Sequence, residues 1–228
     1  MEHPPVVLRV WGDHACFTRP EFKVERVSYP MITPSAARGV VEAIFWRPEI
    51  RYQIRRIGLL QQGGQTVILR NELADRQGSR PILVEEKRQQ RSSLVLKDVA
   101  YLIEVAVLLR PHATDPLPKY LDQLRRRIAR GQYYHCPYLG TREFAANFAP
   151  AGGEQPPSTA FRIGTMLFDQ AFIASRAKPD LTFKLPDREA PVAGYAQALF
   201  FDAAVENGWL SVPRERYQAL YELERGDV

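Results

Sequence analysis

The segment 94–109 constrains the fold more than any other part of the sequence. Val99, Tyr101, Ile103 and Val105 alternate along it, and alanine and leucine occupy much of the opposite face. Alternation with period two indicates a β-strand, and apolar residues on both faces indicate a strand that is covered on both sides. Such a strand lies in the middle of a sheet, so the rest of the chain must supply its neighbouring strands and covering helices.

Two amphipathic helices are predicted around this strand. The first lies within residues 33–48, where a Thr-Pro pair supplies an N-cap and a first helical residue, and apolar residues recur at helical spacing until Pro48. The second runs from about residue 116 to Arg130, and Gly131 suits the left-handed conformation that ends a helix. Each helix has one apolar face, which can cover a sheet.

Three further strands complete the predicted order of elements. Residues 6–11 and 49–60 have strand patterns, and a slip in the alternation near Arg55 predicts a bulge. The short apolar segment 137–139 is predicted as a weak fourth strand. The order strand, helix, strand, strand, helix, strand predicts an α+β chain with a ferredoxin-like βαββαβ domain at residues 1–149, the architecture of RNA-recognition modules.

A long insertion interrupts this domain at about residues 61–93. It is polar, contains glycines and several arginines, and offers little apolar surface to bury. A loop of this length in a compact domain is usually functional or mobile. We therefore expect the insertion to be poorly ordered in the free protein and ordered in a complex.

A smaller β-rich lobe is predicted for residues 150–228. A segment rich in proline and glycine opens it, and short strands follow at 161–168, 181–185 and 198–205. The Asn-Gly pair at 207–208 then predicts a tight hairpin turn. We expect this lobe to pack on the ferredoxin-like domain as a C-terminal extension.

The cations of the chain favour an anionic partner. The net charge is +5, and all but six of the 31 lysines and arginines are arginine. The planar guanidinium group pairs with phosphate through two hydrogen bonds and stacks on bases. A GC-rich genome also enriches arginine, so composition by itself leaves both explanations open.

Other compositional features exclude several function classes. Two cysteines and four histidines offer no disulfide framework and no four-ligand zinc pattern, so no metal or other cofactor is expected. The sequence lacks a phosphate-binding loop, a dinucleotide fingerprint and the common hydrolase motifs. It also lacks a membrane-spanning apolar run and a signal-peptide pattern, so we expect a soluble, cytoplasmic protein without a membrane partner.

The loop 17–26 is the first candidate for nucleic-acid contact. Arg19, Lys23 and Arg26 alternate there with aromatic side chains, an arrangement that suits gripping a phosphate backbone and stacking a base. The alternative is a solvated loop in which glutamates of the same segment pair with these cations.

The second predicted helix holds two more candidates. Its arginines are Arg125, Arg126, Arg127 and Arg130, and only one aspartate lies at pairing distance from them in the sequence. They form either a phosphate-binding face or a solvated one. Lys119 and Tyr120 occupy its opening turn, where a cation faces the positive end of the helix dipole and needs some other favourable interaction. Backbone amides and an ammonium group at one helix N-terminus suit a scissile phosphate, although an exposed lysine without a role is equally compatible with the pattern.

Three regions together are similar to one protein family. They are VWGDHACFTRP at 10–20 continuing through SY at 28–29 to TPSAARG at 33–39, GQYYHCPYLGTREF at 131–144, and GTMLFD at 164–169. In this order they resemble the CRISPR-associated RAMP proteins of the Cas-five family, subtype I-C (Dvulg type), over nearly the whole chain.

The resemblance implies a ferredoxin-like RAMP domain with a β-rich extension, and an endoribonuclease that cuts the repeat of precursor CRISPR RNA. The protein would keep the 5′ handle and cap one end of the Cascade surveillance complex beside the backbone and large subunits, meeting target DNA indirectly through the complex. The implied reaction is metal-independent: the upstream 2′-hydroxyl attacks the adjacent phosphate and leaves a 2′,3′-cyclic phosphate and a 5′-hydroxyl.

The resemblance also implies a set of catalytic positions. In the family, a tyrosine ends the first helix and a Lys-His pair opens the second, and these positions hold Phe45, Lys119 and Tyr120 here. A phenylalanine can neither give nor accept a proton, and a tyrosine of pKa about 10 is a poor general base near neutral pH. The other candidates for the base are Tyr29, His14 and His135, and the matched motifs add Arg38 and Arg142 to the candidate RNA contacts.

Two further readings compete with the nuclease. The departures at positions 45 and 120 also suit a non-catalytic, handle-binding structural subunit of Cascade. Incubation with the cognate repeat RNA in EDTA separates these two, because only the enzyme yields a shorter fragment. A small-molecule enzyme on the same scaffold is the third alternative, and no cofactor motif favours it.

Overall fold

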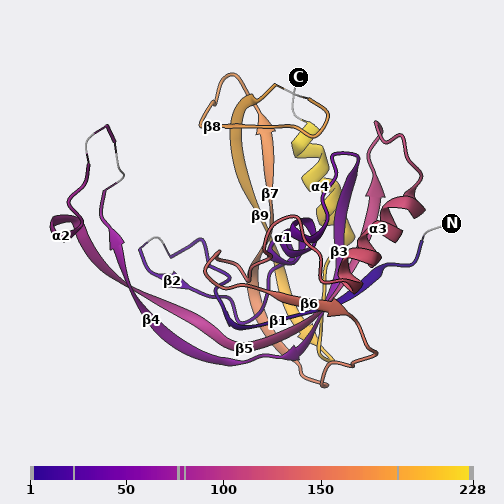
Figure 1. Ribbon diagram of the computed structural model, residues 1–228, viewed down its shortest axis with the longest axis horizontal. Helices are drawn as coiled ribbons and strands as arrows, with labels where there is room; N and C mark the ends of the chain where they lie inside the picture. Colours follow the sequence, from indigo (N-terminus) through magenta and orange to yellow (C-terminus); the bar gives the residue numbers. More distant parts are fainter. Residues whose placement is uncertain (1–2, 23, 76–77, 80, 189, 226–228) are drawn as a thin grey trace.

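The computed structural model describes residues 3–22, 24–75, 78–79, 81–188 and 190–225 of the chain. The protein is α+β, with a mostly antiparallel sheet and few helices (Figure 1). The strands are β1 (Val6–Ala15), β2 (Arg26–Val27), β3 (Ile50–Gln61), β4 (Gly64–Leu73), β5 (Arg88–Leu109), β6 (Asn147–Pro150), β7 (Phe161–Ala174), β8 (Leu181–Phe183), β9 (Val192–Glu206) and β10 (Trp209–Ser211). The helices are α1 (Pro34–Ile44), α2 (Val84–Lys87), α3 (Leu117–Ala129) and α4 (Arg214–Arg225).

Strand β5 is the centre of the sheet, which confirms the prediction from its alternating pattern. Its C-terminal half lies between β1 and β3, and its N-terminal half pairs with β4. The sheet path runs β6-β1-β5-β3-β10-β9-β7. Val99, Tyr101, Ile103 and Val105 are buried in one core, because the two-residue period turns all four to the same face.

The two predicted helices of the first half are confirmed. The Thr33 hydroxyl accepts from the backbone N–H of Ala36, as an N-cap does, and Pro34 opens α1. Helix α3 buries Leu121, Leu124 and Ile128 and is followed by Gly131 at φ +62°. Helix α1 packs against β3 and β7, and α3 packs against β5 and β6.

The predicted fourth strand is wrong in position. Residues 137–139 form part of a tight loop in which Leu139 is buried and exchanges backbone hydrogen bonds with Cys16 and Phe144. The strand that pairs with the free edge of β1 is β6, a few residues later. Pro137 has no N–H to give to a ladder, whereas Asn147–Pro150 can lie antiparallel to Trp11–Leu8.

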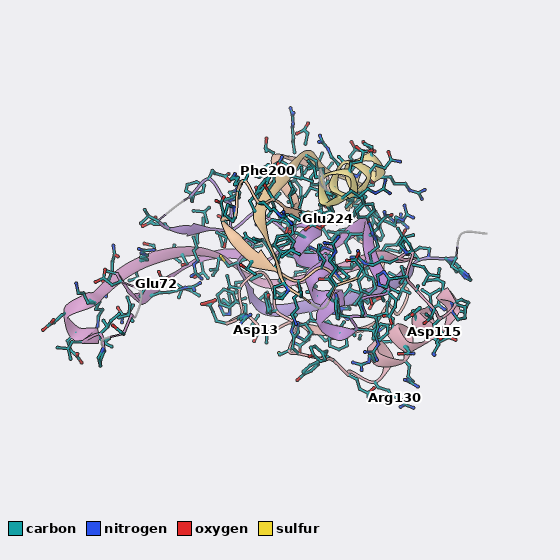
Figure 2. All side chains as sticks on the ribbon, turned by 90° about the horizontal axis from the view of Figure 1, so that it is seen from above. Asp13, Glu72, Asp115, Arg130, Phe200 and Glu224 are labelled. Atoms are coloured by element: carbon teal, nitrogen blue, oxygen red, sulfur yellow. The ribbon has the colours of Figure 1, made fainter. Side chains whose placement is uncertain are left out.

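The interpretation of residues 61–93 as a loop is also wrong. Strand β4 pairs with β5 throughout its length, and Figures 1 and 2 show the pair projecting as an arm with α2 at its tip. The polar composition hides a two-residue pattern, in which Ile68 and Arg70 face inward while Val67 and Leu69 are exposed. Asp98, at φ +57°, lies where β5 passes from the arm into the rest of the sheet.

The C-terminal part continues the same sheet. Strand β10 pairs with β3, so β7, β8 and β9 extend the sheet of the first half. The predicted turn at Asn207 and Gly208 is confirmed, with φ values of +50° and +80°.

Helix α4 was absent from the expectations because most of its surface is charged. Its Tyr217 hydroxyl accepts from the N–H of Ile54 at 2.7 Å, next to the bulge that the sequence predicted between Ile54 and Arg56. The bulge removes a ladder partner and α4 replaces it, which ties the C-terminus to β3.

In the described part of the chain, no helix combines the length and apolar character needed to cross a membrane. Within the same residues, no group of three or more histidine, cysteine, aspartate or glutamate side chains has a metal-binding arrangement.

Candidate active site and nucleic-acid interface

The end of α1 is closed by side chains and backbone from α3 and the loop after it. The Arg127 guanidinium donates to the Ile44 carbonyl at 3.0 Å, and the N–H of Tyr134 donates to the Ala43 carbonyl at 2.8 Å. These bonds satisfy carbonyls that a helix C-terminus otherwise leaves without partners. Arg127 is therefore turned inward, unlike its neighbours on α3.

Phe45 is buried at this end of α1. The Arg47 and Arg127 guanidinium groups lie 5.7 and 5.5 Å from the centre of its ring, and its carbonyl accepts from the Tyr52 hydroxyl at 2.6 Å. The ring has no polar atom, so this position supplies packing and a surface for cations.

Lys119 is exposed in the first turn of α3. Its Nζ donates to Asp115 Oδ2 at 2.7 Å, and this carboxylate raises the pKa of the Lys119 ammonium. Asp115 is the favourable interaction that the position of this cation against the helix dipole required. Lys119 is thus a charged group that is held in place and open to solvent.

Tyr120 is buried beside Lys119. Burial raises the pKa of its phenol, and the carboxylates of Glu49 and Asp115 add to the rise. Tyr120 Oη and Glu49 Oε2 are buried without a hydrogen-bond partner among the residues described. A phenol that stays protonated can donate a hydrogen bond but cannot act as general base near neutral pH.

The three other candidates for the base lie in different surroundings. Tyr29 is fully buried, its hydroxyl accepts from the N–H of Leu167, and burial raises the pKa of its phenol. His14 is half-buried on β1 and stacks on Phe144 at 5.8 Å. His135 is exposed, and its backbone N–H donates to the Ala43 carbonyl at 3.3 Å, which places it near Phe45.

His112 is an imidazole that the sequence argument overlooked. It is exposed in the loop between β5 and α3, three residues before Asp115, and its Nε2 lies 3.0 Å from the Pro48 carbonyl. A carbonyl only accepts, so Nε2 donates in this contact, and in the neutral imidazole Nδ1 is then the acceptor nitrogen. Pro48 precedes Glu49, whose charge acts on Tyr120, so His112 is on the Lys119 side of α3. No signal in the sequence links the two loops, because the contact is between residues far apart in the chain.

Two cations of the loop 17–26 form ion pairs, one with the arm and one within the loop. Arg26 lies 3.4 Å from Glu72 of β4, and Arg19 lies 3.3 Å from Glu21 while its guanidinium covers the Tyr29 ring at 4.8 Å. This geometry agrees with the salt-bridge alternative for Arg19, whereas Lys23 lies outside the described residues.

Arg38 is occupied by a structural ion pair. Its guanidinium forms two hydrogen bonds with Asp169 of β7, at 2.7 and 2.8 Å, and a third with Glu42 at 2.7 Å. Asp169 is buried, so this arginine joins α1 to β7 and is poorly placed to bind phosphate.

The remaining arginines of α3 face solvent. Arg125, Arg126 and Arg130 are exposed, and Asp122 approaches Arg125 only to 3.9 Å. The loop that follows exposes Tyr133 by 51% and Tyr134 by 80%. Figure 2 places Asp115 and Arg130 at opposite ends of α3, so this cationic and aromatic surface, which we call the α3 surface, extends from the Lys119 end of the helix to the loop beyond it. Arg142 is exposed in the same connection between α3 and β6.

Comparison with known proteins gives consistent matches. The family model described as CRISPR-associated protein (Cas_Cas5) matches residues 6–213. The chain is 60% identical over 220 residues to a protein of Thermus thermophilus named CRISPR pre-crRNA endoribonuclease Cas5d, with 96% of each chain covered. A protein of the same name from Mannheimia succiniciproducens is 36% identical over 222 residues, covering 90% of this chain and 93% of the relative.

Two solved structures share the fold. A functionally uncharacterized protein of Streptococcus mutans superimposes with a TM-score of 0.62 at 21% identity, and a protein described as CRISPR-associated does so with 0.63 at 20% identity. In both cases 95% of each chain is covered.

Proposed function

Because the chain belongs to the CRISPR-associated Cas5 family, we propose that it is an endoribonuclease that cuts the repeat of precursor CRISPR RNA. The names of the two Cas5d relatives support this substrate. The observation that carries the proposal is the exposed Lys119 ammonium, held by Asp115 at the start of α3 and continuous with the α3 surface.

The proposed reaction needs one proton acceptor and one cation. The 2′-oxygen attacks the adjacent phosphorus, so an O2′–P bond forms while the P–O5′ bond breaks and the 2′,3′-cyclic phosphate results. The 2′-hydroxyl proton passes to a base, and Lys119 stabilises the charge on the phosphate and gives a proton to the leaving 5′-oxygen. The reaction is proposed to need no metal ion.

His112 is the proposed base, because it is exposed, its Nε2 is held by the Pro48 carbonyl, and it lies three residues before the Asp115 that binds Lys119. We expect His112→Ala to slow single-turnover cleavage by about 10² or more, the usual contribution of a general base, with little change in repeat binding. His135→Ala is the matched control, since His135 is also exposed but adjoins the other end of α3. A rate lost in the His135 variant and kept in the His112 variant would reverse this assignment.

Phe45→Tyr tests whether the hydroxyl present in the family is needed here. Two guanidinium groups lie near the ring, and their charge would offset part of the rise that burial gives to the pKa of a phenol placed there. We expect single-turnover cleavage to become at least about tenfold faster. A rate equal to that of the parent would show that His112 or another base already suffices.

The α3 surface is proposed to hold the RNA backbone, with Tyr133 and Tyr134 stacking on bases. Removing Arg125, Arg126 and Arg130 together should reduce the slope of log affinity against log salt by about 2, near 0.7 for each lost phosphate contact. Arg216→Ala, which removes an exposed arginine of α4, should leave the slope unchanged. An unaltered slope in the triple variant would argue against this surface.

A non-catalytic, handle-binding subunit is the second candidate. Two residues favour this alternative, Phe45 and Tyr120, because neither can accept a proton near neutral pH. Single-turnover incubation of the full chain with cognate repeat RNA in EDTA decides between the two. A shortened product with a cyclic phosphate end supports the nuclease, and tight binding without product supports the structural subunit.

The domain division, the cellular location and the place in Cascade are part of the same proposal. The order β6-β1-β5-β3 with α1 and α3 as connections supports a ferredoxin-like RAMP domain over residues 1–149, with 150–228 as its β-rich extension. We further propose a cytoplasmic, subtype I-C protein that keeps the 5′ handle of the crRNA and caps Cascade beside its backbone and large subunits. Contact with target DNA would be indirect.

A further inference from the structure

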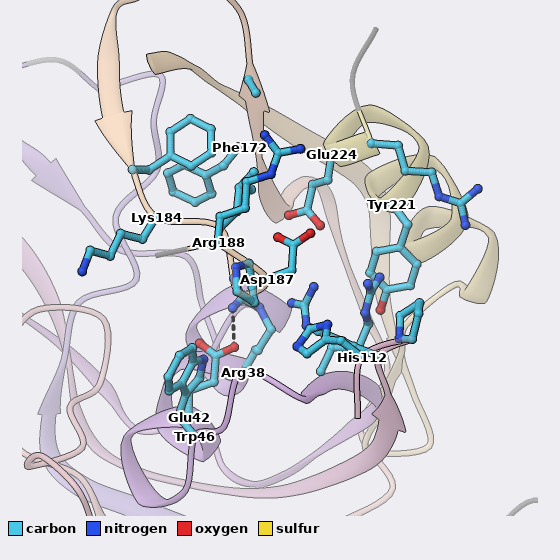
Figure 3. A pocket seen from close by; sticks show the side chains of 18 residues that line it. Arg38, Glu42, Trp46, His112, Phe172, Lys184, Asp187, Arg188, Tyr221 and Glu224 are labelled. Carbon is cyan, nitrogen blue, oxygen red and sulfur yellow. Dashed lines mark hydrogen bonds and ion pairs between the residues drawn. The ribbon is translucent and has the colours of Figure 1, made fainter. Parts of the chain in front are cut away.

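A cavity of about 680 Å³ opens beyond the end of α1. Figure 3 shows residues of α1, of the loop after β5, of the end of β7, of the segment after β8 and of α4 around it. Trp46 and His112 are among its lining residues, so the cavity is lined by the proposed base and by the residue that follows Phe45. Its volume is within the range of sites that enclose a small ligand.

The cationic groups of this cavity exceed its anionic groups. Arg38 pairs with Asp169 and Glu42, whereas Arg51 and Arg110 both act on Glu224, and the charge of Glu42 reaches Arg110 as well. Burial and the neighbouring Arg51 both lower the pKa of the Arg110 guanidinium. The Arg51 guanidinium lies over the Tyr221 ring at 4.1 Å, and Arg110 Nε donates to the Ile50 carbonyl at 3.3 Å. The two like charges act on each other, and a bound anion such as phosphate would reduce that repulsion.

Further cations line the opening of the cavity. Lys184 and Arg188 belong to the segment after β8. Of the lining residues in that segment, Asp187 is the one with a carboxylate. Figure 3 shows Lys184, Arg188 and Asp187 among the side chains around the cavity. These cations add to the excess of positive charge among the lining residues.

Aromatic rings form the apolar part of the wall. Trp46 is 50% exposed, and Phe172 is 38% exposed while its ring centre lies 5.5 Å from that of Phe183. Exposed rings beside guanidinium groups are the elements that bind unpaired nucleotides, because the base stacks and the phosphate pairs.

We propose that this cavity binds one unpaired nucleotide of the substrate RNA, with its base stacked on Trp46 and its phosphate on Arg51 and Arg110. The inference rests on the proposed function and extends it from the scissile phosphate to a neighbouring nucleotide. Because Trp46 follows Phe45 and His112 lines the cavity, the bound nucleotide would be close to the cleaved bond. The cavity would thus select the cut position.

The test measures equilibrium binding of the full chain to cognate repeat RNA made uncleavable by a 2′-deoxy substitution at the cut site. Abasic nucleotides are introduced singly at each unpaired position. In the parent, one position should lose about tenfold in affinity, the typical effect of one lost stacking contact. In Trp46→Ala this loss of affinity should disappear, because the variant has no indole ring on which the base can stack.

Trp46→Phe and Arg216→Ala are the matched variants. Phenylalanine keeps a stacking ring and should retain most of the penalty, while Arg216 is an exposed arginine of α4 that is not among the lining residues. Arg188→Ala provides a second test that leaves the rings intact and should weaken binding of the parent RNA. Trp46 is half exposed, and circular dichroism of each variant checks that it is folded.

An identical abasic profile in the parent and Trp46→Ala overturns the proposal. Binding by Arg188→Ala that equals binding by Arg216→Ala would contradict a role for the cations of the cavity. Cleavage of unmodified repeat by the parent in EDTA is measured separately. If the parent does not cleave but the penalty depends on Trp46, the cavity binds a nucleotide and the nuclease proposal fails. If it cleaves and no position depends on Trp46, only the cavity proposal fails.

Discussion

Lys119→Ala is expected to slow single-turnover cleavage of repeat RNA by roughly 10² or more, the effect of removing one preorganised charge-stabilising donor. The ammonium acts when negative charge builds on the phosphate and on the 5′-oxygen, so its loss raises the barrier. Binding of uncleaved repeat should weaken far less, because Lys119 is one cation among many and is already paired with Asp115. Rapid-quench kinetics and an equilibrium titration measure the two quantities.

Lys87→Ala is the matched control for this experiment. Lys87 is also an exposed lysine paired with an aspartate, Asp75 at 2.8 Å, but it lies in α2 at the tip of the arm. Its loss should leave the cleavage rate unchanged. If Lys119→Ala cleaves as fast as the parent, the active site is not at the start of α3, and His14 and His135 become the first residues to test.

Asp169→Ala is expected to lower the free energy of unfolding by about 3 kcal/mol, the low end of the range for breaking a buried ion pair. Asp169 is buried and holds Arg38 through two hydrogen bonds, so its removal leaves a guanidinium group with only Glu42. The pair joins α1 to β7, and the loss should appear as a lower midpoint of denaturant unfolding. Circular dichroism during urea titration measures it.

Asp202→Ala provides the control in the same sheet. Asp202 of β9 pairs with Arg162 of β7 at 2.9 Å, but both side chains are exposed, that of Asp202 by 67% and that of Arg162 by 76%. Exposed pairs contribute little because water screens them, so the expected change is below about 1 kcal/mol. Equal losses in the two variants would contradict a structural role for the Arg38 pair.

The elements governed by local rules could be predicted from the sequence. The N-cap at Thr33, the end of α3 at Gly131, the bulge near Arg55 and the turn at Asn207 each follow from a few adjacent residues, and the structure has all four. The central strand was also predictable, because burial on both faces leaves a continuous apolar pattern.

The elements that depend on distant partners were missed or misplaced. Strand β6 has no strong pattern of its own and forms because the edge of β1 is free, while β4 extends a strand that already leaves the body. Helix α4 is mostly charged and forms where Tyr217 can reach the backbone freed by the bulge. Such pairings depend on the sum of long-range contacts, which a local pattern does not contain.

The candidate site divides in the same way. Residue identity and helix spacing by themselves singled out Lys119, Tyr120 and the excess of arginine, and the family resemblance added Phe45. Only the tertiary structure decided which cations are available: Arg38 and Arg127 are turned into structural contacts, whereas Arg125 faces solvent. It also brought His112 beside Pro48 and formed the cavity next to Trp46, since folding places side by side loops that the chain keeps far apart.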